Sequence, residues 1–213
     1  MSLGKYRGEQ YISPDLTVGE PRCLVSSKWM RISRHTVRIP SNGDIVDDWL
    51  WVDYHDRVNV LVEDEQTDDG GERRFLVFRQ SKYALEGKNS LAVVGGIIEP
   101  GETAIDAARR EVDEEMGMNC ERVLPLGRFR TDVNRGMGWV NSFVAMKCTR
   151  RSGARKFQPI EHGDEVGAAD TEHQSLRSLT LTEITDAARK GQFLEVQWSN
   201  TVSLALLNSE VAT

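Results

Sequence analysis

A capped, glutamate-rich helix constrains this chain more than any other stretch. Thr103 stands three residues before Asp106, which is the spacing of an N-terminal capping box. Gly117 supplies the residue type that commonly ends a helix in the left-handed conformation. The sequence therefore predicts a helix that begins after Thr103 and ends at about Met116.

This helix is expected to have an apolar face and an anionic face. At 3.6 residues per turn, the apolar side contains Ile105, Ala108 and Val112, and the anionic side contains Glu111, Glu114 and Glu115. Like charges four residues apart cost an isolated helix about 0.2–0.5 kcal/mol, so the three carboxylates need a counter-charge. Hard oxygen ligands without Cys or His favour Mg²⁺, with Mn²⁺ as the alternative.

The helix belongs to a longer pattern that resembles the Nudix signature at every defining position. The pattern consists of Gly96 to Glu102 (GIIEPGE), seven further residues, and Arg110 to Met118 (REVDEEMGM). With residue types at roughly 5–7% each, seven fixed positions match by chance on the order of once in 10⁸ to 10⁹ start sites. The resemblance implies an α/β fold, a Nudix α/β/α sandwich with a mixed sheet, and metal-dependent hydrolysis of a nucleoside diphosphate linked to another group.

The resemblance also assigns roles inside the pattern. It implies a metal site made of Glu111, Glu114, Glu115 and the carbonyl of Gly95, and a catalytic set that includes Glu114, Glu115, Arg110 and Glu102. Arg110 and Glu102 are expected to form an ion pair that orients the loop and the helix. The alternative for Gly95 is an ordinary turn at the end of a strand.

The general base is expected on a loop after the helix. In the branch described next, a Glu on such a loop takes the proton of the attacking water, and the segment from Gly167 to Glu172 resembles that loop. Glu172 is therefore the first candidate, with Glu161, Asp164 and Glu165 as rivals. An acidic surface loop without a catalytic role is the alternative.

Outside the signature, the chain resembles the ADP-ribose and ADP-sugar pyrophosphatase branch of the family. The resemblance implies an N-terminal antiparallel β extension, residues 1–56, that forms a homodimer and binds the base, followed by a hydrolase domain, residues 57–213. Trp29 and Trp49 lie where this branch stacks the adenine, and Lys82 lies where it carries a substrate-binding Arg. Packing of Trp29, Trp49 and Trp51 in a sheet or dimer interface, and a solvated Lys82, explain the same residues.

Other substrates and one other class of protein stay open. Asp132, Asn134 and Arg135 are candidates for contacting the distal group, although a polar turn explains them equally well. The substrate is expected to be ADP-ribose or a nucleotide sugar, with a dinucleotide cofactor or a modified nucleotide as alternatives. A nucleotide sensor without turnover is the alternative from another class.

Charge and cysteine content narrow the partners. The net charge of −6 argues against a nucleic acid partner, which needs clustered Lys and Arg. No apolar run approaches the roughly 18 residues of a membrane helix. Three cysteines without a CxxC pair leave one unpaired in any disulfide scheme, which favours a reducing compartment and a cytoplasmic protein.

The remaining secondary structure follows from hydrophobic periodicity and turn residues. A β-hairpin is expected over 28–57 with its turn at 41–44, and an acidic loop is expected over 63–72. Further strands are expected at 58–62, 75–79, 90–94, 123–129, 139–147 and 176–179, with a loop at 131–138. An irregular segment is expected at 149–171, and helices are expected at 181–190 and 196–207.

Overall fold

The computed structural model describes residues 10–67, 71–152 and 174–212. The chain forms two compact units. Unit 1 consists of residues 1–57, 97–102 and 128–140, and unit 2 consists of residues 58–96, 103–127 and 141–213. Each unit is described by itself.

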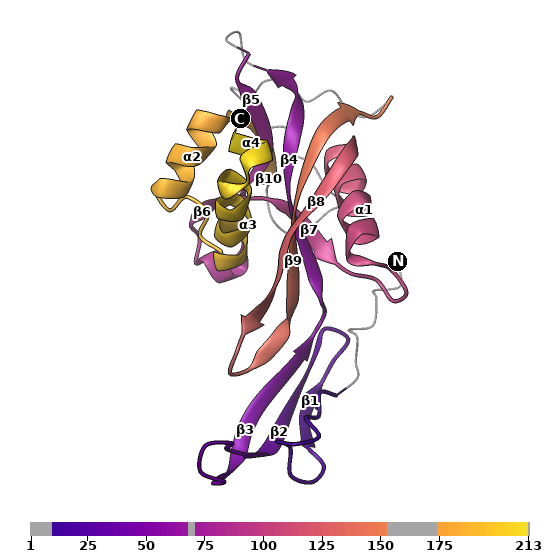
Figure 1. The fold of residues 1–213 in the computed structure, drawn as a ribbon, viewed down its shortest axis with the longest axis vertical. Coiled ribbons are helices and arrows are strands. Elements are labelled where there is room, and N and C mark those ends of the chain that lie inside the picture. Colours follow the sequence, from indigo (N-terminus) through magenta and orange to yellow (C-terminus); the bar gives the residue numbers. More distant parts are fainter. Residues whose placement is uncertain (1–9, 68–70, 153–173, 213) are drawn as a thin grey trace. The chain divides into compact units, whose positions relative to one another are not determined.

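Unit 1 is built on three antiparallel strands, shown in indigo and purple in Figure 1. They are β1 (Arg22–Ser26), β2 (Met30–Arg38) and β3 (Ile45–Tyr54), and β2 pairs with β3 over most of its length. The β2–β3 turn is closed by Asn42, whose side chain accepts a hydrogen bond from the Asp44 N–H at 3.1 Å. The predicted hairpin and its turn are therefore confirmed, and β1 adds a strand that was not predicted.

Strand β3 has a second neighbour in unit 1. Val52 pairs in parallel with Gly136, the first residue of β9 (Gly136–Arg150), and its N–H donates to the Arg135 carbonyl at 2.8 Å. A side chain at Gly136 would meet the Trp51 indole at 2.6 Å. The close approach of these two strands therefore depends on a residue without a Cβ.

The strands of unit 2 form a sheet in which β9, β4, β5 and β10 are successive neighbours, while β6 pairs with β5, β7 with β4 and β8 with β9. Their bounds are β4 (Arg57–Thr67), β5 (Arg73–Ser81), β6 (Asn89–Ala92), β7 (Val94–Ile97), β8 (Met118–Asp132) and β10 (Gln174–Thr180). The centre is apolar because β4 and β5 contribute buried side chains on both faces, among them Leu61, Phe75 and Phe78.

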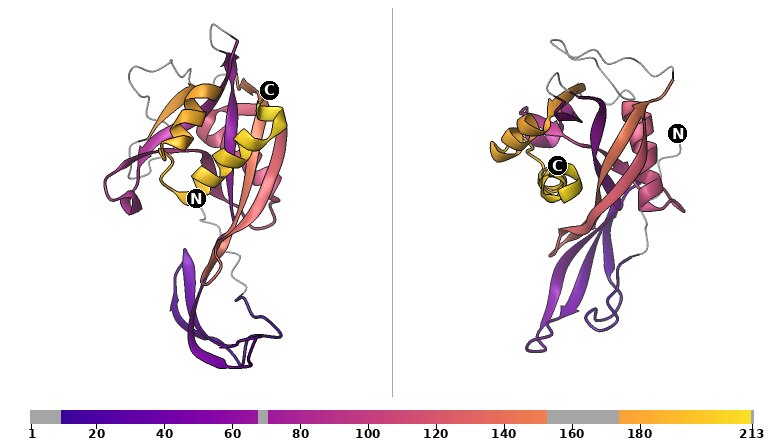
Figure 2. Two further views of the ribbon diagram at one scale, coloured as in Figure 1. Left: turned by 60° about the vertical axis from the view of Figure 1, so that its left-hand side comes forward. Right: turned by 45° about the horizontal axis from the view of Figure 1, so that its top comes forward.

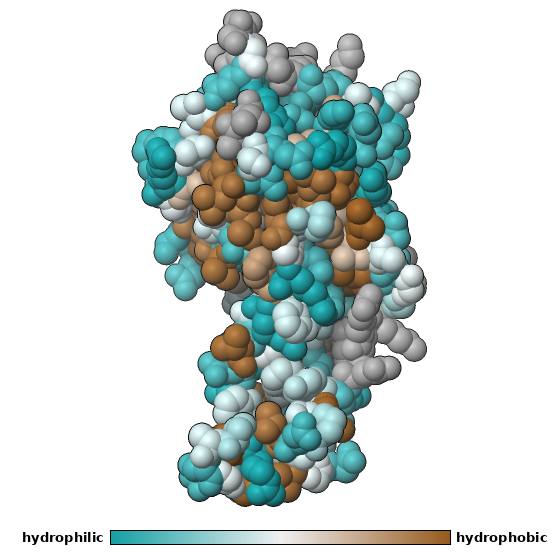
Figure 3. Space-filling model, viewed as in Figure 1, coloured by the Kyte–Doolittle hydropathy of each residue, from teal (hydrophilic) through white to brown (hydrophobic). Residues whose placement is uncertain are grey.

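Helices cover both faces of the unit 2 sheet, as Figures 1 and 2 show. One side carries α1 (Ala104–Met116), and the other carries α2 (Leu181–Arg189) and α3 (Val196–Leu207); η1 (Tyr83–Leu85) and α4 (Ser209–Ala212) are short. The predicted α/β/α sandwich is confirmed. Figure 3 shows apolar side chains gathered on the face that carries α3, where Val196 and Leu207 remain exposed.

The acidic stretch after residue 62 differs from the prediction. Residues 63–67 were expected to begin a loop, but they continue β4 and pair with β5, as in Glu63 with Phe75. Glu63 is held by an ion pair with Arg73 at 2.6 Å and accepts the Lys147 N–H at 2.7 Å. Long-range partners therefore compensate for a composition that is typical of loops.

Three other predicted boundaries also shift. The strand expected at 90–94 is divided into β6 and β7, and the strands expected at 123–129 and 139–147 extend into β8 and β9. The predicted loop over 131–138 contracts to a short turn in which Asp132 accepts from the N–H groups of Asn134 and Arg135. These three residues, the candidates for distal-group contact, build that turn.

Two of the three cysteines form a disulfide, which the sequence did not predict. Cys120 on β8 and Cys148 on β9 are bonded, and Cys23 is free and exposed. Because disulfides are rare in the cytosol of most cells, this pair bears directly on the cytoplasmic location, which stays a prediction. No helix among the described residues is long and apolar enough to cross a membrane.

The disulfide gives a direct prediction of thiol content. Protein purified without reductant should react with a thiol reagent at Cys23 alone under denaturing conditions, and reduction should add the thiols of Cys120 and Cys148. Replacing both bonded cysteines with Ala should lower the free energy of unfolding by about 2–4 kcal/mol in urea denaturation. Three reactive thiols before reduction would contradict the pairing.

Candidate functional site

Helix α1 carries the candidate metal ligands and is fixed at both ends. The Thr103 side chain accepts from the Asp106 N–H at 3.2 Å, and Gly117 adopts a left-handed conformation with φ 64°. Ala107, Ala108, Val112 and Met116 are buried. The predicted helix is confirmed, with its apolar side in the core; Ile105, however, is an exposed apolar residue.

Glu111 lies directly against the glycine pair that precedes the helix. Glu111 is only 8% exposed. A Cβ added to Gly96 would meet the Oε1 atom of Glu111 at 2.0 Å. A Cβ added to Gly95 would meet the Val58 carbonyl oxygen at 2.3 Å. The two glycines are therefore required by space, and Gly96 leaves room for a carboxylate beside the backbone of β7.

Arg110 supplies the counter-charge for two of the three predicted ligands. Its Nη1 atom lies 2.7 Å from Glu111 Oε1 and 3.1 Å from Glu114 Oε2. Both carboxylates thus converge on one cationic atom, which offsets the repulsion expected on this helix face. The predicted pair of Arg110 with Glu102 stays a prediction; within unit 1, Glu102 accepts the Glu99 N–H at 3.0 Å and closes its loop.

The donor set fits a hard divalent cation in its chemistry. Oxygen ligands from Glu111 and Glu114 already meet at a cationic atom, and the glycine at position 96 leaves space beside them. Within the described ranges, no three His, Cys, Asp or Glu side chains are placed so that they could hold one metal ion together. In this structure Glu111 and Glu114 are paired with Arg110 rather than arranged around one metal position.

Unit 1 contains a stack of aromatic and guanidinium groups, here called the Trp51 stack. The Tyr11 ring stacks on Trp51 with centroids 4.7 Å apart. Arg130 lies 5.4 Å from the Trp51 ring and 4.3 Å from the Trp139 ring, and Arg128 lies 4.4 Å from Trp139. Such contacts join flat surfaces to positive charge, a combination suited to bases and phosphates.

Acidic residues fix the Trp51 stack. Asp56 accepts from Arg128 at 3.1 Å and from the Trp139 N–H at 3.0 Å, and Asp53 accepts from the Trp51 indole at 2.9 Å. Burial lowers the pKa of the Arg130 guanidinium from its usual value, and Asp56 partly offsets that shift. The arginines of this stack are therefore held in place.

The predicted substrate-binding residues are separated along the chain. Trp29 and Trp49 belong to unit 1, where Lys28 lies 4.9 Å above the Trp29 ring and Arg135 lies 5.5 Å from the Trp49 ring. Lys82 belongs to unit 2 and precedes η1. The base candidates Glu161, Asp164, Glu165 and Glu172 lie outside the described residues.

Four residues of the Trp51 stack were not predicted as site residues from the sequence: Tyr11, Arg128, Arg130 and Trp139. A signal existed, because Arg128 and Arg130 are two residues apart on a strand and therefore share a face. Trp139 follows soon after them on the neighbouring strand β9, whereas Trp51 is distant in sequence and lies on β3, which pairs with β9.

A buried histidine beside the Trp51 stack makes unit 1 sensitive to acid. Burial lowers the pKa of His35, which is 3% exposed, and Asp53 only partly offsets the shift. The folded state therefore favours neutral His35, so its contribution to stability is complete above the unfolded pKa of about 6.5 and is lost as pH falls through the folded pKa.

Calorimetric Tm should accordingly fall between pH 7 and pH 5, and a His35→Gln variant should show a weaker fall. His55, whose pKa burial also lowers, keeps part of the dependence in that variant. An identical pH profile for both proteins would contradict this role of His35.

Comparison with known proteins gives the family and the fold. The family model of the NUDIX domain matches residues 53–197. A similar solved structure is the crystal structure of an ADP compounds hydrolase, which has 16% sequence identity and a TM-score of 0.65 over 92% of this chain and 94% of that chain. At that identity the likeness shows the fold. No curated protein sequence matches the chain.

Proposed function

Because the chain belongs to the Nudix family, we propose that it uses a divalent metal ion, Mg²⁺ first, to hydrolyse the diphosphate of a nucleoside diphosphate linked to another group. The preferred substrate is ADP-ribose or a nucleotide sugar. The products are then a nucleoside monophosphate and a sugar phosphate. The observation that carries the proposal is the Glu111 carboxylate held against Gly96, beside Arg110 and Glu114.

Each residue of the signature has a proposed task. Glu111, Glu114 and Glu115 hold the metal together with the Gly95 carbonyl, and Arg110 and Glu102 orient the loop and the helix. A bound divalent ion neutralises charge on the phosphoryl oxygens. Glu172 takes the proton from the water that attacks phosphorus, and the bond from phosphorus to the bridging oxygen breaks.

Unit 1 is proposed to bind the base and to form the homodimer. Trp29 and Trp49 are the first candidates for stacking, and Lys82 in unit 2 is the candidate for a phosphate contact. The Trp51 stack supports the assignment of unit 1, because its rings and guanidinium groups are fixed by Asp53 and Asp56. The similar structure of an ADP compounds hydrolase favours an adenine base.

The experiment compares substrates with and without metal. The purified protein is incubated with ADP-ribose, ADP-glucose, UDP-glucose, NADH and diadenosine polyphosphates, and phosphate release is measured after phosphatase coupling. We expect metal-dependent release from one diphosphate substrate and none after metal removal. Binding of ADP-ribose without turnover would instead support the nucleotide sensor. Turnover of NADH or a diadenosine polyphosphate alone would assign the substrate to the dinucleotides instead of the nucleotide sugars.

A further inference from the structure

Unit 2 contains a cavity on α1 that shares Arg110 with the candidate metal site and is otherwise lined by other residues. It lies between the second half of α1, the start of β8 and the end of β9. Its volume is about 710 Å³. This volume lies within the range of about 300–1,000 Å³ that is typical of small-molecule sites. Asp113 lines the cavity and is two residues from Glu111, so the two side chains point about 160° apart around the helix.

Positive charge dominates the polar lining of this cavity. Its charged side chains in the described part of the chain are four arginines and one carboxylate: Arg109, Arg110, Arg150, Arg151 and Asp113. Arg110 and Arg150 are engaged by glutamates, at 2.7 Å from Glu111 and 3.8 Å from Glu65. Arg151 is paired with Asp113 at 2.8 Å, so in the described part of the chain the excess positive charge of this lining is that of Arg109.

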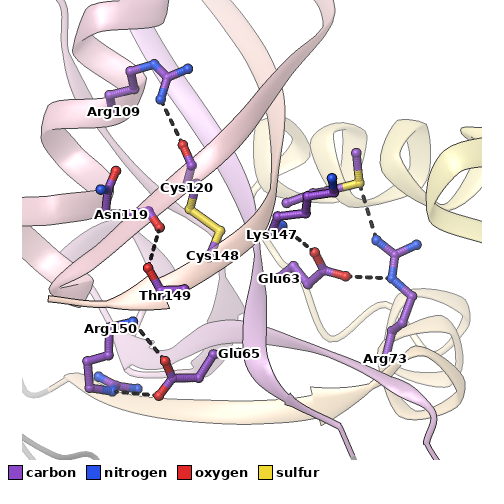
Figure 4. Close-up of a disulfide and its surroundings, with 11 residues drawn as sticks. Glu63, Glu65, Arg73, Arg109, Asn119, Cys120, Lys147, Cys148, Thr149 and Arg150 are labelled. Carbon is purple, nitrogen blue, oxygen red and sulfur yellow. Dashed lines mark hydrogen bonds and ion pairs between the residues drawn. A yellow bond between two sulfur atoms is a disulfide. The ribbon is translucent and has the colours of Figure 1, made fainter.

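Arg109 and Arg151 are the two groups suited to hold an anion. Arg109 donates to the Cys120 carbonyl at 2.8 Å, which is a neutral acceptor and leaves the guanidinium charge in place (Figure 4). Arg151 pairs with Asp113 at 2.8 Å, and its side chain is 60% exposed. A guanidinium that is already oriented by one hydrogen bond can still present its other N–H groups to a phosphate.

Asp113 supplies a second, independent sign of a ligand. Its Oδ2 atom accepts from Arg151, whereas its Oδ1 atom is buried and accepts no hydrogen bond. A buried carboxylate oxygen without a donor costs free energy. A rotation of the Asp113 carboxylate, whose side chain is 40% exposed, would bring this oxygen to a ligand hydroxyl in the cavity. Val112, Met118, Val123 and Ala145 form the apolar part of the wall, and Asn119, Cys120, Thr149 and Ser152 complete the lining.

We propose that this cavity binds a small phosphate monoester that carries hydroxyl groups, such as a sugar phosphate. Arg109 and Arg151 hold the phosphate, Asp113 Oδ1 accepts a hydroxyl, and the apolar wall covers the carbon skeleton. A phosphate fits this pair because each guanidinium is a planar fork of N–H donors, and the phosphate oxygens accept from them. The site stands apart from the proposed hydrolysis, and its test does not depend on turnover.

The test measures binding of ribose 5-phosphate and of inorganic phosphate by isothermal titration calorimetry in metal-free buffer. Wild-type protein should bind ribose 5-phosphate saturably and inorganic phosphate more weakly. Arg109→Gln and Arg151→Gln should each raise the Kd for both probes at least about tenfold. Arg189→Gln is the matched control, because Arg189 is an exposed arginine in the last turn of α2.

Asp113→Ala separates the hydroxyl contact from the phosphate contact. This variant should weaken ribose 5-phosphate several-fold, while inorganic phosphate should bind as well as before or better, since Arg151 loses its ion-pair partner. Equal Kd values in wild type, Arg109→Gln and Arg151→Gln would overturn the proposal, as would the absence of saturable binding. A loss of affinity in Arg189→Gln equal to that in the two cavity variants would overturn it as well.

Discussion

Glu111→Gln is expected to lower kcat by about 10²–10³ on the substrate that the panel identifies, with little change in the fold. The amide keeps the shape of the buried side chain beside Gly96 but removes the negative charge that the proposed metal needs. The measurement is metal-dependent phosphate release at saturating substrate, together with the circular dichroism spectrum of each variant.

The matched control is Glu121→Gln. Glu121 is an exposed glutamate on β8 that pairs with Lys147 at 3.6 Å, and its loss should leave kcat unchanged. Full activity in Glu111→Gln would contradict the proposed metal ligand. An equal loss in both variants would show that the effect comes from overall charge rather than from the position of Glu111.

Gly95→Ala is expected to lower the free energy of unfolding by about 1–3 kcal/mol. The new methyl group would meet the Val58 carbonyl oxygen at 2.3 Å and the Asn59 side chain at 2.6 Å, and a backbone oxygen within a sheet cannot move aside easily. Urea denaturation measures the change.

Gly96→Ala provides the comparison for Gly95→Ala. Its methyl group meets the carboxylate of Glu111, the far end of a flexible side chain, so unfolding should change less while activity should fall because Glu111 is displaced. If Gly96→Ala destabilised the protein more than Gly95→Ala, the assignment of the rigid contact to position 95 would be wrong.

The parts of the fold that depend on local chemistry were predictable from the sequence. Thr103 and Gly117 specify both ends of α1, because a side-chain cap and a left-handed glycine act within a few residues. The same holds for Thr180, whose capping box with Glu183 begins α2. The turn at Asn42 also follows from a side chain that bonds its own neighbours.

The parts that depend on distant partners were not predictable. The acidic residues at 63–65 have the composition of a loop, but Glu63 meets Arg73 and the Lys147 N–H, and Glu65 accepts from the Arg150 N–H. Cys120 and Cys148 give no local sign that they face each other across two strands. Hydrophobic periodicity alone therefore underestimated the lengths of β4, β8 and β9.

The candidate site divides in the same way. The spacing of the glutamates on α1 follows from helical geometry, so the sequence was sufficient to place Glu111 and Glu114 near each other on the helix, and their role as metal ligands stays a prediction. The ion pairs of Arg110 with these glutamates depend on rotamers and were not predicted, and the pair of Arg110 with Glu102 stays a prediction. The contact of Arg130 with Trp51 and Trp139 needs the tertiary fold.

The distribution of chromophores gives each unit its own optical signal. Of the five tryptophans, Trp29, Trp49, Trp51 and Trp139 belong to unit 1, and only Trp198 belongs to unit 2. In the described part of the chain, every helix belongs to unit 2. Intrinsic fluorescence thus follows mainly unit 1, and ellipticity at the helical band follows unit 2. Coincident denaturation curves would mean that both units melt as one cooperative block, and separated curves would reveal a half-folded intermediate.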